Sequence, residues 1–402
     1  MKVAFIGLGA MGLPMSQCLS RNESVDLSLF DLDSERLEMA RGSGELAGSM
    51  AETISGADVI MSVLPADVHV LAVADEIKRH GAPNQTYLDF STIAPQTITK
   101  VSQQLDAIGI RTVGLGLLRG TPAARAGTLV LYGGGFEGVR EQVYPLLASM
   151  SSDVIDLGTP EAAKALKVAN NMVVGCLDAL ICEVIAIGEK TGFSARDVVD
   201  RLIEAGCDSW VLRHHTVPHV LPDDLGPGKF ATRLMAKDMR LFGMMAEDYG
   251  CPSRLSAVAL SYYRGSLAHG HDLDYHPIVV RWLRNGMAAQ DVISDPDALT
   301  AVIAGAVWVQ ALVTYDALAV TSAAGLDPKV ASRQMDEGSG GNGSLSALIS
   351  SGDYDRDTFD VGSAVSSLRR ATDAADRINA PAVFFEMAKV DAATISSPPG
   401  QK

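Results

Sequence analysis

The sequence predicts an α/β domain with a doubly wound sheet, followed by an all-α domain that is present twice. Three observations support this prediction. Short apolar runs alternate with helical stretches over residues 1–158, no clear strand follows residue 159, and two stretches of the remainder match each other in order. Alternation of this kind is typical of a parallel sheet with crossover helices.

Six apolar runs in the first domain have the length and composition of buried strands. Helical stretches separate them, which is the pattern of a parallel sheet with crossover helices. The six predicted strands are Val3–Ile6, Leu27–Phe30, Val59–Val63, Tyr87–Phe90, Arg111–Leu115 and Leu129–Tyr132.

The first predicted strand leads directly into a glycine-rich turn with the pattern G-x-G-x-x-G. Gly7 allows the tight turn, Gly9 lets the backbone approach a pyrophosphate, and Gly12 lets the next helix pack closely on the strand. That helix, from about Met11 to Ser20, would direct its free N–H groups at the phosphates. Although such a turn also occurs without a ligand, its place predicts a Rossmann-type cofactor site. The residues of this site are Gly7, Leu8, Gly9, Ala10, Met11 and Gly12.

An acidic residue stands where the adenosine ribose would be held. Asp31 follows the second predicted strand and lies 19 residues after the last motif glycine. An acid there binds the ribose hydroxyls, and its charge repels a 2′-phosphate, which favours NAD over NADP. The nearest arginine, Arg36, comes five residues later. Asp31 could instead cap the next helix, but Asp33 and Ser34 suit that cap better.

From residue 159 the pattern changes to helices. Thr159 can cap a helix, Pro160 suits its first turn, and the apolar pattern then runs unbroken to about Lys190. About 30 residues give a helix of roughly 45 Å. Because one small domain cannot bury an apolar helix of that length, the helix must cross a domain boundary or pack on a neighbour.

The last quarter of the chain repeats the part before it. Residues 184–193 match residues 317–326 at an offset of 133, and three later positions match at an offset of 129. Matches in a common order favour duplication over shared composition. The three later pairs are Phe230 with Phe359, Arg240 with Arg369, and Pro252 with Pro381.

The repeat defines the predicted domain boundaries. We expect a dinucleotide-binding domain at 1–158, a helical catalytic domain at 159–290, a second, degenerate helical copy at 291–392, and a disordered polar tail at 393–402. We also expect the two helical copies to pack through a pseudo-twofold contact within the chain, which would cover the long apolar helix.

Composition and charge narrow the function classes. Hydrophobic residues make up 47% and charged residues 20%, as in a soluble globular chain. The net charge of −15 argues against nucleic acid and anionic membranes as partners. Five cysteines without C-x-x-C spacing indicate reduced thiols in a cytoplasmic protein, and neither a disulfide set nor a metal site. No uninterrupted apolar run approaches the ~18 residues of a membrane span.

Four sequence blocks, in order, resemble the β-hydroxyacid dehydrogenase family, which includes 3-hydroxyisobutyrate and 6-phosphogluconate dehydrogenases. The resemblance covers residues 1 to about 287. It implies a dinucleotide domain, a helical domain, a cleft between them, and lysine-based acid–base catalysis during hydride transfer. The blocks are Gly7–Met15, Asp89–Pro95, Lys167–Asn171 and Lys237–Met239.

By this resemblance, Lys167 is the catalytic lysine. Oxidation of an alcohol needs a base for the hydroxyl proton, and reduction needs the same group as an acid. A lysine can serve at neutral pH if burial and a nearby nicotinamide cation lower its pKa. Asn171 lies four residues on, hence on the same helical face, where it can bind the substrate hydroxyl. Lys167 could instead be an ordinary solvated helix lysine, which is the role that we expect for Lys164.

The resemblance implies further site residues. Ser91 would bind the substrate carboxylate and Thr92 the cofactor, at the carboxyl end of the sheet where such folds bind ligands. Both could also belong to a strand-to-helix cap. Leu64 and Pro65 would line the cofactor, and Lys237 would contact cofactor or substrate unless it is an exposed helix charge.

Two departures from the family pattern put the usual short substrates in doubt. Where the family carries Ser-Gly-Gly, this chain has Leu118, Arg119 and Gly120. The guanidinium can bind a carboxylate, sulfonate or phosphate, so we keep Arg119 and Gly120 as substrate-binding candidates, with a surface arginine as the alternative. A glycine pair before the catalytic lysine is also replaced, by Glu161 and Ala163.

The second copy lacks these functional residues, which indicates a structural role. At the repeat offsets, Lys167 aligns with Thr300, Asn171 with Ala304 and Lys237 with Ser366.

The sequence therefore predicts an NAD-dependent oxidoreductase that transfers a hydride between nicotinamide and a small acid bearing a β-hydroxyl, with Lys167 as general acid/base. One alternative is an imine reductase-like enzyme, against which Lys167 counts. The other is a non-catalytic dinucleotide-binding protein, which the altered loop favours and the Lys167/Asn171 pair disfavours. We expect a small acid as the partner, no nucleic acid and no membrane, while a homodimer through another face stays open.

Overall fold

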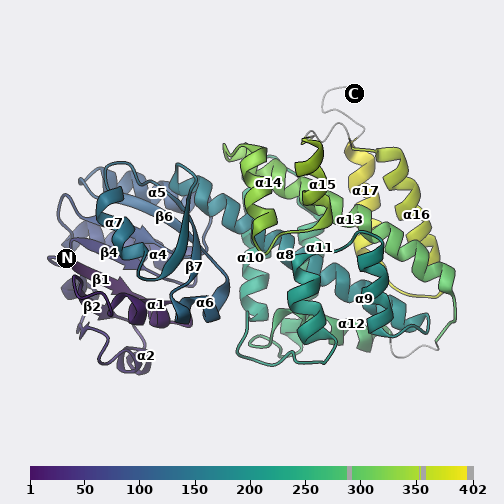
Figure 1. Cartoon of the computed structure of the whole chain (residues 1–402), viewed down its shortest axis with the longest axis horizontal. Coiled ribbons are helices and arrows are strands. Elements are labelled where there is room, and N and C mark those ends of the chain that lie inside the picture. The colour runs from purple at the N-terminus through teal and green to yellow at the C-terminus, as the bar shows by residue number, and fades with distance from the viewer. Residues whose placement is uncertain (288–291, 353, 355–358, 396–402) are drawn as a thin grey trace. The chain divides into compact units, whose positions relative to one another are not determined.

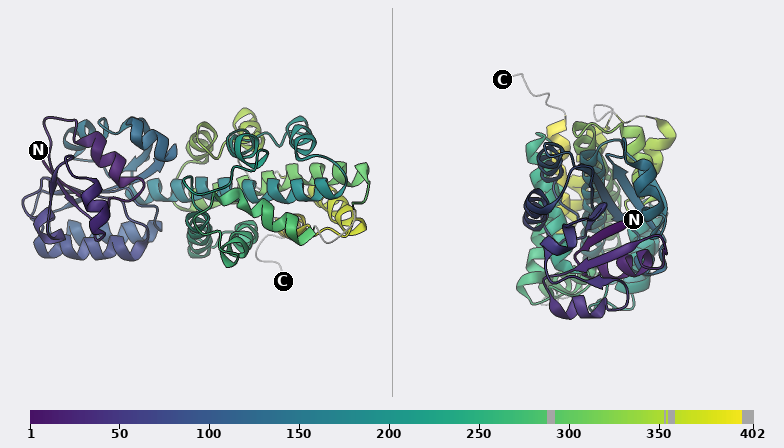
Figure 2. Two further views of the ribbon diagram at one scale, coloured as in Figure 1. Left: turned by 90° about the horizontal axis from the view of Figure 1, so that it is seen from below. Right: turned by 90° about the vertical axis from the view of Figure 1, so that its left-hand side faces the viewer.

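The structure is a computed structural model that describes residues 1–287, 292–352, 354 and 359–395. The chain divides into two compact units, Met1–Val168 and Ala169–Lys402. The boundary falls inside one long helix, α8 (Pro160–Lys190). The first unit contains the sheet, and the described elements after α8 are all helical (Figures 1 and 2).

The first unit is built on an eight-stranded sheet in the order β3-β2-β1-β4-β5-β6-β7-β8. All six predicted strands are present, and no end differs from its expected position by more than three residues. Two strands were missed: β3 has only two residues, and β8 carries apolar side chains at Val154 and Ile155 alone. The strands are β1 (Lys2–Ile6), β2 (Asp26–Phe30), β3 (Glu45–Leu46), β4 (Val59–Ser62), β5 (Thr86–Asp89), β6 (Arg111–Leu118), β7 (Leu129–Gly134) and β8 (Ser151–Asp156).

The sheet is parallel as predicted except at one place, where β6 and β7 pair antiparallel. The connection between them, residues 119–128, is shorter than the dozen or more residues that a parallel crossover needs. All other neighbouring strands pair in parallel.

Helices cover both faces of the sheet, as the doubly wound class requires. Buried side chains of α1, α6 and α7 share one apolar cluster with the sheet, and those of α3, α4 and α5 share another. The helices of this unit are α1 (Gly12–Leu19), α2 (Ser34–Met39), α3 (Met50–Ile54), α4 (Asp67–His80), α5 (Pro95–Asp106), α6 (Gly120–Ala126) and α7 (Arg140–Leu147).

Glycines on β6 and β7 let the start of α8 lie directly on the sheet. A Cβ at Gly114 would be 2.9 Å from Cα of Pro160, and one at Gly134 would be 2.0 Å from the carbonyl oxygen of Thr159. A Cβ at Gly116 would be 2.8 Å from Cβ of Lys167. The first two turns of α8 are therefore seated where the sheet has no side chains.

The second unit contains paired helices whose bounds follow the predicted repeat. α9 (Ala195–Glu204) becomes α14 (Pro328–Glu337) when 133 is added to both ends, and α10 (Thr232–Asp248) becomes α16 (Val361–Arg377) when 129 is added. The remaining helices are α11 (Arg254–Ala268), α12 (Val279–Met287), α13 (Pro296–Ala323), α15 (Gly343–Ser351), α17 (Val383–Ile395), the π-helix η1 (Leu212–Val220) and the 3-10 helix η2 (His276–Ile278).

Backbone contacts between the repeated segments have the symmetry of a local twofold. Ser209 and Asn342 form an isolated antiparallel bridge. Trp210 N donates to Gly341 O at 2.8 Å, and Gly343 N donates to Asp208 O at 2.9 Å. At the repeat offset of 133, Asp208 corresponds to Gly341 and Trp210 to Gly343, so the two bonds are equivalent. A pseudo-twofold contact between the copies would produce this relation.

Two helices, α8 and α13, are long and apolar enough to span a membrane by length and composition. The most apolar window of α8 is wholly buried within the protein, and 61% of the α13 window is buried. Buried core helices of soluble proteins have the same character, so this is weak support for a span. At the other end, α17 runs to Ile395, so the predicted tail cannot begin at 393; residues 396–402 lie outside the described residues.

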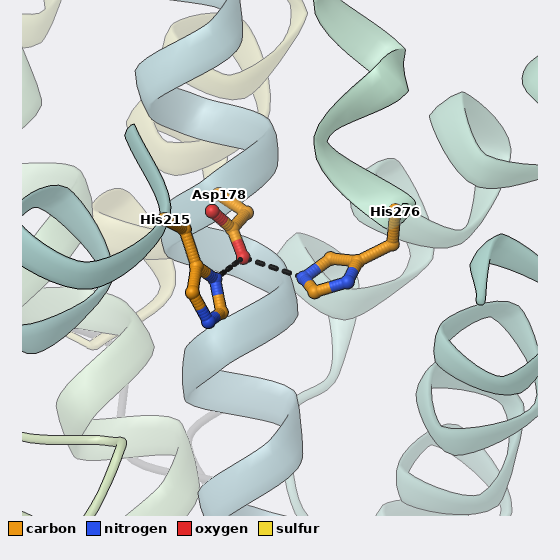
Figure 3. A group of neighbouring side chains, drawn as sticks. All are labelled: Asp178, His215 and His276. Atoms are coloured by element: carbon orange, nitrogen blue, oxygen red, sulfur yellow. Dashed lines mark hydrogen bonds and ion pairs between the residues drawn. The ribbon is translucent and has the colours of Figure 1, made fainter. Parts of the chain in front are cut away.

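A buried carboxylate joins three elements of the second unit (Figure 3). Asp178 on α8 accepts hydrogen bonds at Oδ2 from His215 Nδ1 at 2.8 Å and from His276 Nε2 at 2.6 Å. The other ring nitrogen of His276 faces the carbonyl oxygen of Phe230 at 3.2 Å. Each ring nitrogen of His276 therefore has an oxygen partner, one on Asp178 and one on the backbone. Burial raises the pKa of Asp178, but the two histidines outweigh burial and hold that pKa below its usual range.

Replacing Asp178 by Asn should destabilise the protein. Removal of one partner leaves the other buried and uncompensated, so we expect a loss of about 3 kcal/mol in the free energy of unfolding. Asp200→Asn is the matched control, because its exposed pair with Arg196 should contribute less than about 1 kcal/mol. Urea unfolding monitored by circular dichroism gives both values, and equal losses would contradict a stabilising core pair.

The same pair predicts a pH dependence. Because the folded pKa of Asp178 is lowered, its stabilisation is fully present above the ordinary value of 3.8 and is lost as the pH falls below it. Wild-type stability should therefore fall more steeply with acidification in that range than the stability of Asp178→Asn. Parallel curves would show that Asp178 is not the titrating group.

Candidate functional site

The glycine-rich turn has the conformation that a dinucleotide site needs. Gly7 has a φ of +95°, and a Cβ there would lie 2.4 Å from the carbonyl oxygen of Val63. A Cβ at Gly12, the first residue of α1, would lie 1.9 Å from the carbonyl oxygen of Gly7. Around Gly9 the nearest atom to a built Cβ is 3.8 Å away, on Arg36. A side chain at Gly7 or Gly12 would therefore clash with the backbone, whereas Gly9 has space beside it through which a pyrophosphate can approach.

Asp31 is held beside this turn. Its Oδ2 accepts from Leu8 N at 2.6 Å and its Oδ1 from Asp33 N at 2.8 Å. Asp33, and not Asp31, caps α2 by accepting from the backbone N–H groups of Glu35 and Arg36, as the sequence indicated. The carboxylate of Asp31 is therefore at the turn, where a ribose would be bound.

Arg36 lies closer to the cofactor turn than its place in the sequence suggested. Its guanidinium lies 3.8 Å from the Cβ position of Gly9 and pairs with Asp33 at 3.3 Å. The first turn of helix α2 follows Asp33 and places the side chain of Arg36 next to the glycine-rich turn. The number of residues between Asp31 and Arg36 does not reveal this proximity.

The expectation that Lys164 is a solvated helix lysine was wrong. Its side chain is fully buried, and Nζ lies 2.7 Å from Oδ2 of Asp89, which is also fully buried. Nζ also donates to the carbonyl oxygens of Asp89 and Ser91 at 2.8 Å and of Leu115 at 2.7 Å. The ammonium group of Lys164 therefore links the end of β5 and the middle of β6 to the N-terminal part of α8.

Ser91 belongs to the same buried group. Its hydroxyl donates to Asp89 Oδ1 at 2.7 Å and accepts from Leu64 N at 2.9 Å. A hydroxyl has one hydrogen to donate. The hydroxyl of Ser91 would therefore have to break its hydrogen bond to Asp89 before it could donate to a substrate carboxylate. Thr92 is half-buried beside it, and Pro65 is exposed after β4.

Lys167 is the half-buried member of a stretch of α8 in which residues 162–166 and 168–171 are buried. The stem of its side chain packs over Gly116, near the carboxyl end of β6. Ligands of open α/β sheets bind at that end. The amine of Lys167 is therefore carried at the edge of the sheet where the cofactor turn also lies.

Asn171 follows one turn later on α8, and α10 fixes its side chain. Nδ2 of Asn171 donates to Oδ2 of Asp238 at 2.6 Å. The other oxygen of Asp238 lies 3.1 Å from Nζ of Lys237. The structure thus brings Asn171 and Lys237 together through Asp238. Asp238 is a buried residue of the Lys237–Met239 block, for which the sequence predicted no role of its own.

Arg119 and Gly120 stand at the end of β6. Arg119 is exposed, and its φ of +74° places a side chain in the left-handed region that favours glycine. Gly120 has a φ of +65°. The positions of the second copy that align with the functional residues, Thr300, Ala304 and Ser366, are all exposed.

Asp178, His215 and His276 are a candidate metal-ligand set, because their ligand atoms all lie within 4.8 Å of one another. The ligand types suit zinc. A metal ion would, however, have to replace both of the hydrogen bonds that Oδ2 of Asp178 accepts from the two histidines. We therefore assign this cluster to the stability of the second unit.

Comparisons with known proteins agree with this geometry. The NAD binding domain of 6-phosphogluconate dehydrogenase matches residues 2–158, and the NAD-binding region of NADP-dependent 3-hydroxyisobutyrate dehydrogenase matches residues 162–283. The chain is 30% identical over 279 residues to an NAD-dependent L-serine dehydrogenase of Pseudomonas aeruginosa, covering 67% of this chain and 93% of that one. It is 31% identical over 271 residues to a 3-hydroxyisobutyrate dehydrogenase of the same organism, covering 65% and 90%.

Solved structures give the same result for the fold. The 3-hydroxyisobutyrate dehydrogenase of Mycobacterium tuberculosis has a TM-score of 0.65 at 28% identity, covering 70% of this chain and 99% of that one. The 6-phosphogluconate dehydrogenase of Plasmodium falciparum has a TM-score of 0.70 at 14% identity and covers 99% of this chain and 93% of that one, so its likeness in fold extends over the second helical copy. The chain belongs to the β-hydroxyacid dehydrogenase family, whose members similar to it are oxidoreductases that use a nicotinamide dinucleotide.

Proposed function

We propose that Lys167 is the general acid/base in the dehydrogenation of a small acid bearing a β-hydroxyl. The position of Lys167 carries this assignment. Lys167 is half-buried on an otherwise buried stretch of α8, its stem lies on Gly116 at the carboxyl end of β6, and Asn171 follows on the same helical face. Lys164, by contrast, donates its three hydrogens to carbonyl oxygens and forms an ion pair with Asp89, so it has no role left in proton transfer.

In this proposal each side chain has a separate role. NAD, when bound, accepts the hydride. Lys167 takes the hydroxyl proton during oxidation and returns it during reduction. Asp238 holds Nδ2 of Asn171 at 2.6 Å. Oδ1 of the same amide accepts from Nδ2 of Asn170 at 3.4 Å, and its second lone pair can accept from the substrate hydroxyl. The N–H of Leu8 is held by Asp31, so Ala10 and the turn residues after it bind the pyrophosphate through their backbone N–H groups.

The substrate class follows from the named relatives. L-serine, 3-hydroxyisobutyrate and 2-(hydroxymethyl)glutarate are the acids in their names. Each has a hydroxymethyl group on the carbon that bears a carboxylate. We propose that this arrangement is what the enzyme recognises. The test is a panel of these acids with NAD and NADP, followed by the absorbance of the reduced cofactor. A protein that binds NAD but oxidises no acid would support the non-catalytic alternative.

We also propose the domain assignment 1–158, 159–290 and 291–392, with a cytoplasmic enzyme that acts on a free small acid. None of the five cysteines forms a disulfide, which suits a reducing compartment. The acidic net charge of −15 disfavours nucleic acid and anionic membranes. A homodimer, if formed, would use a face other than the contact between the helical copies.

Lys167→Ala should lower kcat at least about 100-fold, because a positioned acid–base group contributes that much. The affinity for NAD should change little. Lys100→Ala, which removes an exposed lysine of α5, is the matched control and should keep full activity. Steady-state kinetics and NAD titration test this. A Lys167→Ala enzyme with more than about a tenth of wild-type kcat would show that another group moves the proton.

NAD should be preferred over NADP, because the carboxylate of Asp31 binds ribose hydroxyls and repels a 2′-phosphate. The expected ratio of kcat/KM is about 30- to 100-fold, the scale of hydrogen bonds to charged groups. Arg36→Ala should leave the NAD value unchanged and widen the ratio, since Arg36 is the cation nearest the open glycine. A wild-type ratio that favours NADP would contradict the role of Asp31.

Arg119→Ala should raise KM for the best acid substrate about tenfold or more while kcat changes less, if the guanidinium binds the anionic end. Arg119→Gly is a second variant that suits the left-handed backbone at φ +74°, and it should share the rise in KM without loss of thermal stability. An unchanged KM in both variants would show that Arg119 is a surface residue that does not bind the substrate.

A further inference from the structure

A loop of the second helical copy lies on α8 beside the proposed catalytic residues. The loop, residues 338–343, connects α14 to α15. Asn170 of α8, which is fully buried, donates from Nδ2 to Ser339 Oγ at 2.8 Å and accepts at Oδ1 from Gly340 N at 3.0 Å. The copy that has lost its own functional residues thus holds the residue next to Asn171.

The loop is built for this contact. A Cβ at Gly340 would lie 2.9 Å from Oδ1 of Asn170, and one at Gly341 would lie 2.5 Å from the carbonyl oxygen of Asp336. Asn342 is buried, caps α15 and donates to the carbonyl oxygen of Gly340 at 2.9 Å. Small residues therefore bring the backbone of the loop against α8 in one fixed shape.

The contact between this loop and Asn170 lies next to Lys167 on the surface of α8. Asn170 lies three residues after Lys167 and Asn171 lies four residues after it, so their side chains flank that of Lys167 on the helix. The loop holds Asn170 on one flank, and Asp238 of α10 holds Asn171 on the other. A small acid held by Lys167 and Asn171 would therefore lie within reach of the loop.

The hydroxyl of Ser339 can donate a hydrogen bond beside Asn170. Its oxygen accepts from Asn170, and that bond does not use its own O–H. The side chain is half-buried, so it is open to a ligand. The chain lacks the serine of the Ser-Gly-Gly loop at Leu118–Gly120, yet residues 339–341 read Ser-Gly-Gly.

We infer that Ser339 binds the carboxylate of the substrate, so that the second helical copy completes the acid site within one chain. The inference rests on the proposed function, because it needs the acid to lie beside Lys167. It assigns to the duplicated copy a part in substrate specificity as well as in covering α8.

The test compares Ser339→Ala with Ser339→Thr, which keeps the hydroxyl, and with Ser350→Ala as a matched control. Ser350 is exposed on α15 and bonds only to the carbonyl oxygen of Ser346 among the described contacts. Ser339→Ala should raise KM for the acid about tenfold, the scale of one hydrogen bond to a charged group, while kcat and KM for NAD change less than about threefold. Ser339→Thr should recover most of the affinity, and Ser350→Ala should behave as wild type.

Titration calorimetry of the acid into the enzyme with NADH gives a second readout that does not need turnover, and a melting curve of each variant reports its folding. An unchanged KM and acid affinity in a folded Ser339→Ala enzyme would overturn the inference and leave the proposed function intact. A fall in kcat alone would also overturn it, because the loop would then only position Asn171. A wild-type enzyme that oxidises no β-hydroxy acid would remove the proposed function, and the inference with it.

Discussion

The buried pair of Lys164 and Asp89 is the contact on which the proposed site depends. Asp89 ends β5, and Nζ of Lys164 also binds the carbonyl oxygens at the ends of β5 and within β6. Burial of two charges is costly, so such a pair stabilises little by itself, but its many fixed acceptors allow one arrangement only. α8 is thereby set on the sheet in one register. Lys167 follows one turn later over Gly116, and Asn171 one turn after that.

The length of α8 creates a second requirement, which the duplicated copy meets. The helix is buried almost throughout, although no single layer of helices could cover it. The loop after α14 contacts α8 at Asn170, and the segment after α9 contacts α13, where Gln310 donates to the carbonyl oxygen of Gly206. The backbone bonds between the two segments exchange under the repeat. Because the covering element is part of the same chain, it is present at a high effective concentration whatever the protein concentration.

The sequence was sufficient where one local pattern decides the structure. The glycine turn, the cap at Asp33 and the positions of six strands depend on neighbouring residues, and the structure confirmed them. The antiparallel pairing of β6 with β7 could have been predicted from the short connection, which the regular alternation of strands and helices concealed. β8 could not, because an edge strand with two apolar residues has too weak a pattern.

Contacts between residues that are far apart in the chain could not be predicted from the sequence. Lys164 and Lys167 are three residues apart in the same apolar helix, and only the position of Asp89 decides which of them is buried. Asp238 and Asn170 depend on partners 67 and 169 residues away along the chain. The cluster around Asp178 joins three segments, and no spacing within one segment reveals it. The family resemblance supplied Lys167 and Asn171, but not the residues that hold them in place.

The central claim is that the amine of Lys167, held over Gly116, moves the substrate proton. Rescue of Lys167→Ala by small primary amines tests it most directly, because the shortened side chain leaves room for an added base at the same place. The account predicts that methylamine and ethylamine restore kcat in proportion to the concentration of the free base, with no effect on the wild-type enzyme. A variant that binds NAD and the acid normally, yet shows no response to any amine over a range of pH, would contradict the assignment of proton transfer to Lys167.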